Sequence, residues 1–149
     1  MCGMPMSAED KTKLDQLFTA ALAARENAYA PYSHFDVGAA VRTPEGDVFA
    51  GANVENAAYP AGCCAETGAI TAMVAAGGRQ ISDILVIADC DRGILPCGAC
   101  RQRIAEFATS DAVVHSAGPE GVRKSVKFAH LLPEAFDRQM LDSEPVRAV

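Results

Sequence analysis

The chain has 149 residues, enough for one domain with a sizeable hydrophobic core. Half of its residues (50%) are apolar and 21% are charged, which is typical of a globular protein, and no apolar run is long enough to span a membrane. The net charge is −6 and the basic residues are scattered, which argues against a nucleic-acid partner and favours a small-molecule ligand.

The first predicted element is a helix that begins after Ser7, a residue typical of helix N-caps, and has acidic residues in its first turn. Apolar side chains then follow at helical spacing and predict one buried face: Leu14, Leu17, Phe18, Ala21 and Leu22. Pro31 disfavours helical geometry at the residue before it, so we expect the helix to end near Tyr29.

A β-hairpin is predicted next. Residues 35–41 have the apolar character of a strand, residues 43–47 contain turn-forming residues, and residues 48–51 form the return strand. The polar stretch 53–56 then lies at the strand end, and residues 59–62 form a loop that leads to the first cluster of cysteines.

The second half alternates helices and strands. We expect helices at 64–76 and 97–107, strands at 84–88 and 112–115, a weaker strand or loop at 122–128, and a short closing element at 131–136. Two glycines at 77–78 end the first of these helices, and the continuous apolar run 84–88 predicts a strand buried on both faces. The fold class is therefore a three-layer α/β/α sandwich with a mixed sheet of about five strands. We predict one domain over residues 1–149, with a frayed tail at 143–149.

Six cysteines are present, at positions 2, 63, 64, 90, 97 and 100. The N-terminus has no basic region followed by an apolar run, so we predict no secretory signal, a cytoplasmic location and reduced thiols. Clustered cysteines then favour metal binding or catalysis.

Two short stretches carry the chemistry. In the first, Cys64 is followed two positions later by Glu66, and in the second, Cys97 and Cys100 are separated by two residues. Cys97 and Cys100 share one face of a helical turn, while Cys64 opens another helix. If the two helix N-termini meet, three thiolates can bind zinc and leave its fourth position to water, the arrangement of a catalytic site. Glu66 could then transfer the proton of that water.

Other interpretations of these residues remain open. A structural zinc site would need a fourth ligand, for which Cys63, Cys90 or His34 are candidates. The Cys-x-x-Cys pair could be redox-active, although this leaves Cys64 and Glu66 without a role. Glu66 could also be an ordinary solvated helix residue. We interpret Cys63 as a small packed side chain and Cys2 and Cys90 as non-ligands.

The spacing of Cys64 and Glu66 upstream of Cys97 and Cys100 resembles the zinc-dependent nucleobase deaminases. More of the chain, from about residue 29 to residue 136, resembles the small homotetrameric cytidine deaminases. The matching segments are residues 29–40, 53–62, 64–66, 96–102 and 131–133, together with Phe136.

The resemblance implies hydrolysis of cytidine and 2′-deoxycytidine to uridine and 2′-deoxyuridine, with release of ammonia, in pyrimidine salvage. It implies one zinc ion per chain, a nucleoside substrate and a homotetramer whose sites are completed by neighbouring subunits. The implied roles are zinc binding for Cys64, Cys97 and Cys100, proton transfer for Glu66, ribose binding for Asn53 and Glu55, packing on the nucleoside for Phe35, a backbone contact to the pyrimidine carbonyl for Ala65, and reach into a neighbouring site for Tyr59 and Phe136.

The sequence departs from this resemblance directly after Glu66. Many members with three cysteine ligands have Arg and then Thr there, whereas this chain has Thr67 and Gly68. Zinc with three thiolates has a formal charge of −1, and we hypothesise that Arg101 or another basic residue partly offsets it. Two alternative functions stay open: deamination of a modified nucleoside such as blasticidin S, and a non-catalytic zinc-folded binding protein.

Overall fold

The computed structural model describes residues 7–142, so the expectations for Cys2 and for a frayed tail at 143–149 lie outside the described residues. The elements in chain order are α1 (Ala8–Arg25), β1 (Val37–Arg42), β2 (Val48–Ala52), η1 (Tyr59–Ala61), α2 (Ala65–Ala75), β3 (Ile81–Ala88), α3 (Gly98–Ala105), β4 (Ala108–Gly118), β5 (Gly121–Lys127), η2 (Phe128–His130) and α4 (Arg138–Asp142).

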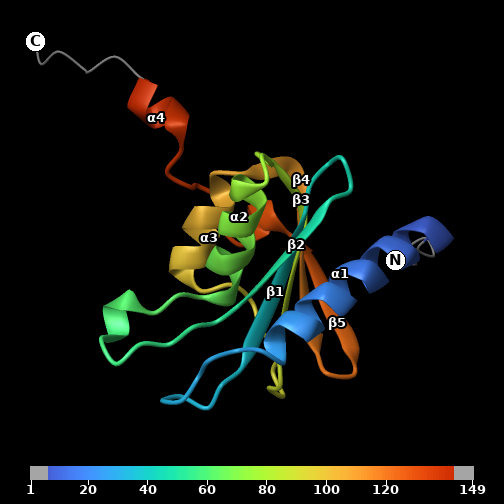
Figure 1. Cartoon of the computed structure of the whole chain (residues 1–149). Coiled ribbons are helices and arrows are strands. Elements are labelled where there is room, and N and C mark those ends of the chain that lie inside the picture. Colours follow the sequence, from blue (N-terminus) through green and yellow to red (C-terminus); the bar gives the residue numbers. More distant parts are fainter. Residues whose placement is uncertain (1–6, 143–149) are drawn as a thin grey trace, which may run out of the picture.

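The five strands form one mixed sheet in the order β2-β1-β3-β4-β5. Strands β3 and β4 pair in parallel through the α3 crossover, and the other neighbours are antiparallel. Helix α1 covers one face of the sheet and helices α2 and α3 cover the other (Figure 1). The predicted three-layer fold with a mixed five-stranded sheet is confirmed.

Helix α1 begins as predicted, because the Ser7 hydroxyl accepts a hydrogen bond from the Asp10 N–H at 3.0 Å. Leu17 and Ala21 are buried on the face toward the sheet. The helix ends at Arg25, earlier than expected. The reason lies at Tyr29, whose N–H donates to the Asn53 carbonyl and whose extended backbone forms a bridge with Val54.

The larger part of the core lies between the sheet and the α2/α3 layer. Strand β3 is buried on both faces from Ile84 to Ala88, as the continuous apolar run predicted. Helix α2 ends at two glycines: Gly77 has a φ of 97°, and Gly78 N–H donates to Met73 O at 2.9 Å. This is the Schellman arrangement, and it fixes the end of the helix that begins at the cysteines.

The C-terminal part differs from expectation in detail. Strand β5 is formed, and it pairs with β4 although Arg123, Lys124 and Ser125 are all exposed. The closing element is not at 131–136: η2 at 128–130 inserts the buried Phe128 into the core, and residues 131–134 are turns.

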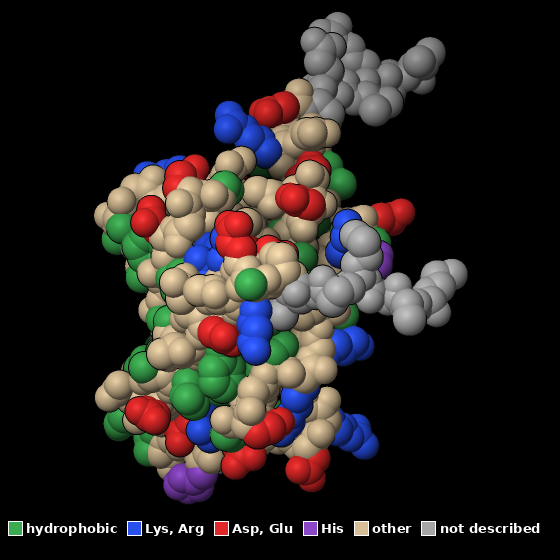
Figure 2. Space-filling view, turned by 90° about the vertical axis from the view of Figure 1, so that its right-hand side faces the viewer, with side chains coloured by type: hydrophobic (Ala, Val, Ile, Leu, Met, Phe, Trp, Pro, Cys, Tyr) green, Lys and Arg blue, Asp and Glu red, His purple; other side chains and the backbone are tan. Residues whose placement is uncertain are grey.

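Figure 2 views the molecule from the side of α1 and β5. Acidic and basic side chains are interspersed there, and basic ones gather along the right-hand margin.

Within residues 7–142, no helix combines the length and apolar character needed to cross a bilayer.

Candidate active site: a three-cysteine group beside an open cavity

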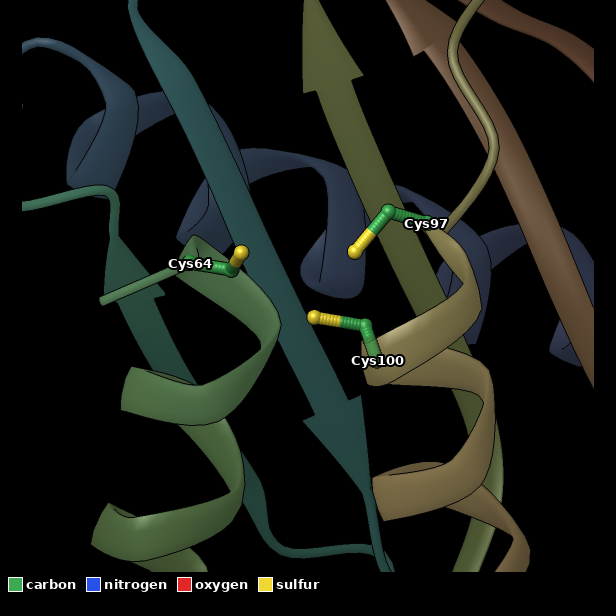
Figure 3. A group of neighbouring side chains, drawn as sticks. All are labelled: Cys64, Cys97 and Cys100. Atoms are coloured by element: carbon green, nitrogen blue, oxygen red, sulfur yellow. The ribbon is translucent and has the colours of Figure 1, made fainter. Parts of the chain in front are cut away.

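Three cysteines from two helix starts converge, and we call Cys64, Cys97 and Cys100 the three-cysteine group. Cys64 is the N-cap of α2, Cys97 is the N-cap of α3, and Cys100 lies in the first turn of α3. Their Sγ atoms all lie within 4.8 Å of one another and point into one shared space (Figure 3). The convergence predicted from the two sequence stretches is therefore present in the structure.

The donor set fits a zinc ion. Three sulfurs bound tetrahedrally at about 2.3 Å would be roughly 3.8 Å apart, so only a small contraction of the group is needed. Cys100 is buried, Cys64 is half-buried and Cys97 is exposed, which leaves one side of the group accessible. Among the residues that the structure describes, no fourth Cys, His, Asp or Glu joins the group, so Cys63, Cys90 and His34 do not complete a structural site.

The thiols themselves are in unequal environments. Burial raises the pKa of Cys64 and of Cys100, and the negative charges of Glu66 and the other cysteines act in the same direction. The pKa of Cys97 is lowered, chiefly by the backbone N–H of Cys100. A divalent cation among the sulfurs would reverse the first effect, because a coordinating thiol is deprotonated.

Glu66 is a buried carboxyl in the first turn of α2, with 5% of its surface exposed. Burial raises its pKa, while its own backbone N–H, the Cys100 side chain and the charge of Arg103 act in the opposite direction. Glu66 is therefore not an ordinary solvated helix residue, which was one of the alternatives left open by the sequence. The arrangement places a proton-carrying group against the sulfur cluster, where it can exchange protons with a bound water.

An open cavity of about 500 Å³ lies next to the group, and we call it the site cavity. Among the predicted site residues, Asn53, Glu55, Tyr59 and Cys64 line it. The other predicted site residues are not part of this lining: Phe35, Ala65, Glu66, Cys97, Cys100 and Phe136. Ala65 is fully buried as the first residue of α2, and Phe136 accepts a hydrogen bond at its carbonyl from Gln102 Nε2.

Asn53 connects the cavity to the start of β1. Its Oδ1 accepts from Val37 N–H and its Nδ2 donates to Phe35 O, each at 2.9 Å. The side chain thus extends the pairing of β1 with β2 by one residue and fixes the backbone on which Phe35 is carried. Phe35 is 39% exposed, so its ring is available to a ligand.

Glu55 is held by the loop in front of β1. Its Oε2 accepts from Tyr32 N–H at 2.8 Å, and its Oε1 accepts from the Ser33 hydroxyl. The pKa of Glu55 is lowered, chiefly by the hydrogen bond from the Ser33 hydroxyl. Burial acts in the opposite direction, and the backbone N–H groups of Tyr32 and Ser33 add to the lowering. The carboxylate is therefore ionised and oriented before any ligand arrives.

Two contacts to the three-cysteine group were not assigned from the sequence. Arg103 Nη1 lies 3.9 Å from Cys100 Sγ, and Thr67 Oγ1 lies 4.0 Å from the same sulfur. Arg101 does not serve here, because its guanidinium donates to Pro96 O and Leu131 O. Helical spacing could have predicted this difference. Arg103, three residues after Cys100, lies on the same face of α3 as Cys100, whereas Arg101, directly after it, does not.

A family model described as "Cytidine and deoxycytidylate deaminase zinc-binding region" matches residues 11–116. A cytidine deaminase of Halalkalibacterium halodurans is 43% identical over 120 residues, which are 80% of this chain and 91% of the relative. A cytidine deaminase of Sporosarcina psychrophila is 40% identical over 128 residues, which are 86% of this chain and 94% of the relative.

Solved structures give the same result. The crystal structure of cytidine deaminase from Burkholderia pseudomallei superposes with a TM-score of 0.76 at 42% identity, covering 88% of this chain and all (100%) of the other. That of cytidine deaminase from Mycobacterium leprae superposes with a TM-score of 0.68 at 39% identity, covering 80% and 97%.

Proposed function

The chain belongs to the cytidine and deoxycytidylate deaminase family, and from this membership we propose how its residues carry out the reaction. It is a zinc-dependent enzyme that deaminates cytidine by hydrolysis. The observation that carries the residue assignment is the convergence of three thiols, with the buried Glu66 against Cys100 and with Cys64 in the lining of the site cavity. The finer parts of the proposal are activity on 2′-deoxycytidine, a role in pyrimidine salvage and a cytoplasmic location.

Cys64, Cys97 and Cys100 are proposed to hold the zinc ion, which supplies a Lewis acid that acidifies a water molecule. Glu66 accepts one proton of this water while the water oxygen attacks C4 of cytosine. Glu66 then passes that proton to N3. Glu66 then takes the remaining proton of the attacking oxygen and delivers it to the amino group, so that the C4–N bond breaks, ammonia leaves and the C4=O group of uridine forms. Its place two residues after Cys64, buried against Cys100, supports this role.

The nucleoside is proposed to occupy the site cavity. Asn53 and Glu55 line it and provide an amide and a carboxylate for the ribose hydroxyls. The Tyr32 and Ser33 donors hold the carboxylate in place, so little side-chain entropy is lost when the sugar binds. Phe35 and Ala65 lie outside the lining of the cavity, and the roles proposed for them, packing of the Phe35 ring on the nucleoside and binding of the pyrimidine carbonyl by the backbone at Ala65, rest on the family membership.

A homotetramer with shared sites is the proposed assembly. Tyr59 and Phe136 are 76% and 55% exposed, unusual for aromatic side chains, and Phe136 does not line the site cavity of its own chain. A largely apolar groove of about 610 Å³ runs between α2 and α3, with Ile70, Val74 and Phe107 in its lining. These surfaces support subunit contacts that bring Tyr59 and Phe136 to a neighbouring site.

Turnover of cytidine, followed by loss of cytosine absorbance, tests the reaction. The Glu66→Ala variant is expected to retain zinc and to lose turnover by at least 100-fold, in line with the contribution of general acid–base catalysis. Absence of activity on cytidine and 2′-deoxycytidine, with activity on blasticidin S, would establish the modified-nucleoside alternative. Zinc binding without activity on any of the three would support the non-catalytic alternative, and loss of zinc from Glu66→Ala would make Glu66 a ligand.

Mixed assemblies test the shared sites. Glu66→Ala and Phe136→Ala subunits are refolded together, so that some Phe136→Ala subunits sit beside neighbours with an intact Phe136. Recovery of activity above the sum of the separate variants is expected. No recovery, in a sample that light scattering shows to be tetrameric and mixed, would assign Phe136 to its own chain.

A further inference from the structure

The Cys100 sulfur is contacted by two polar side chains from different helices. Arg103 Nη1 approaches it to 3.9 Å from α3, and Thr67 Oγ1 approaches it to 4.0 Å from α2. Cys100 itself has no exposed surface, so these groups, and not bulk water, surround its sulfur. Both side-chain donors of the outer layer therefore contact one ligand, Cys100, whose sulfur points toward those of Cys64 and Cys97 (Figure 3).

Negative charge accumulates at this point. Three thiolates and a divalent cation sum to −1, and the carboxyl of Glu66 is buried next to Cys100. Such charge is costly in a buried site unless a donor or a cation lies against it. Of the described basic side chains, Arg103 is the one with a hydrogen bond to a sulfur of the group, since Arg101 is bound to two carbonyls.

We propose that Arg103 is a positioning residue of the metal centre, which donates a hydrogen bond to the Cys100 thiolate and offsets the excess negative charge of the zinc–thiolate group. The inference rests on the proposed zinc site at Cys64, Cys97 and Cys100. A hydrogen bond from a cation withdraws electron density from sulfur, so the thiolate gives less charge to the metal and the metal remains a stronger Lewis acid. Thr67 adds a neutral donor to the same sulfur.

The position of Arg103 suits this role. It lies three residues after Cys100 on α3, so its side chain runs along the same face of the helix. Arg103 lines the groove between α2 and α3, and its guanidinium end reaches the buried Cys100 sulfur while its aliphatic part lies along the groove.

The test compares zinc retention and the ligand field of four proteins: wild type, Arg103→Gln, Arg103→Lys and the control Lys11→Gln. Lys11 is exposed on α1, across the sheet from the site, so its variant removes one positive charge without touching the group. The rate of zinc transfer to a chromogenic chelator is expected to rise about tenfold in Arg103→Gln, the usual scale for loss of an outer partner of a ligand. Arg103→Lys is expected to lie between Arg103→Gln and wild type, and Lys11→Gln to match wild type.

A spectroscopic measurement separates this role from general stabilisation of the fold. In the Co²⁺-substituted protein, the thiolate-to-metal charge-transfer band is expected to move to lower energy in Arg103→Gln, because the sulfur becomes a stronger donor. The double variant Thr67→Arg/Arg103→Gln places a cation at the other residue that contacts Cys100 Sγ and is expected to return the band and the zinc-release rate toward wild type.

An unchanged band and an unchanged release rate in Arg103→Gln would overturn the inference. If Arg103→Gln does not fold, Arg103→Lys and the double variant still decide it through the same two readouts. Arg103-dependent zinc retention in a protein that does not deaminate cytidine would refute the proposed function and leave this inference standing.

Discussion

Gly51 of β2 and Gly68 of α2 lie against each other, so that the strand packs directly on the backbone of the helix. A Cβ atom added to Gly68 would lie 3.3 Å from Gly51 Cα, and one added to Gly51 would lie 2.4 Å from Ala69 N and 2.6 Å from Ala65 O. The close approach explains the glycine at position 51, where any side chain would meet the backbone of the helix. It also sets the distance between β2 and the helix that presents Cys64 and Glu66.

Gly51→Ala is expected to lower the free energy of unfolding by about 1–3 kcal/mol, as for other overpacked sites. The obstructing atoms are backbone and cannot rotate away, so α2 must shift and turnover should fall as well. Gly68→Ala is the matched control: its tight contact is offset by a gain in helix propensity of about 1 kcal/mol, so a net change near zero is expected. Thermal unfolding and cytidine turnover measure both, and equal effects of the two variants would refute the packing argument.

Neighbouring cysteines are expected to differ sharply. Cys64→Ser removes one sulfur from the three-cysteine group, and zinc content after dialysis should fall by at least tenfold. Cys63→Ser should retain zinc, because Cys63 is outside the group and its Sγ lies 3.5 Å from the Cys64 carbonyl. Metal analysis of both purified variants decides the assignment, and zinc loss from Cys63→Ser would reverse it.

Asn53→Ala is expected to act on stability and on substrate binding together. The change leaves Val37 N–H and Phe35 O without their partner, at a cost of about 1–2 kcal/mol in unfolding free energy. The loop that carries Phe35 then loosens, and KM for cytidine should rise. Denaturant unfolding and steady-state kinetics are the measurements. A raised KM with unchanged stability would limit Asn53 to the ribose contact.

Asp83 predicts an acid-sensitive component of stability. Burial alone would raise its pKa, but hydrogen bonds from His115 and Ser82 outweigh this effect and lower it. A carboxyl whose pKa is depressed in the folded state stabilises the protein above its unfolded pKa of about 3.9, and the contribution is lost as the pH falls through the folded value.

Unfolding midpoints measured from pH 6 down to pH 3 should therefore fall less steeply in Asp83→Asn than in wild type. The expected difference at pH 6 is about 1 kcal/mol, a small value because the side chain is 32% exposed. Asp91→Asn, in an exposed loop, is the control. Parallel pH profiles of wild type and Asp83→Asn would contradict the assignment.

The sequence predicted the layers and the metal group because both depend on local spacing. Cys97 and Cys100 share a helical face by their separation alone, and the continuous apolar run of β3 is consistent with a strand buried on both faces, which the structure confirms. The contacts to Cys100 depend on how α2 and α3 approach each other. The sequence alone therefore could not show that Arg103, and not Arg101, contacts the sulfur. Strand β5 was ambiguous because its pattern is weak and its pairing with β4 decides the conformation.

Strand β5 forms one edge of the sheet, and no strand within residues 7–142 pairs with its side away from β4. Arg123, Lys124 and Lys127 stand on this strand as exposed side chains. Charged residues on an edge hinder the addition of another strand, because two such edges repel each other and lose hydration when they join. These basic side chains, which lie outside the lining of the site cavity, thus protect the folded protein against edge-to-edge aggregation.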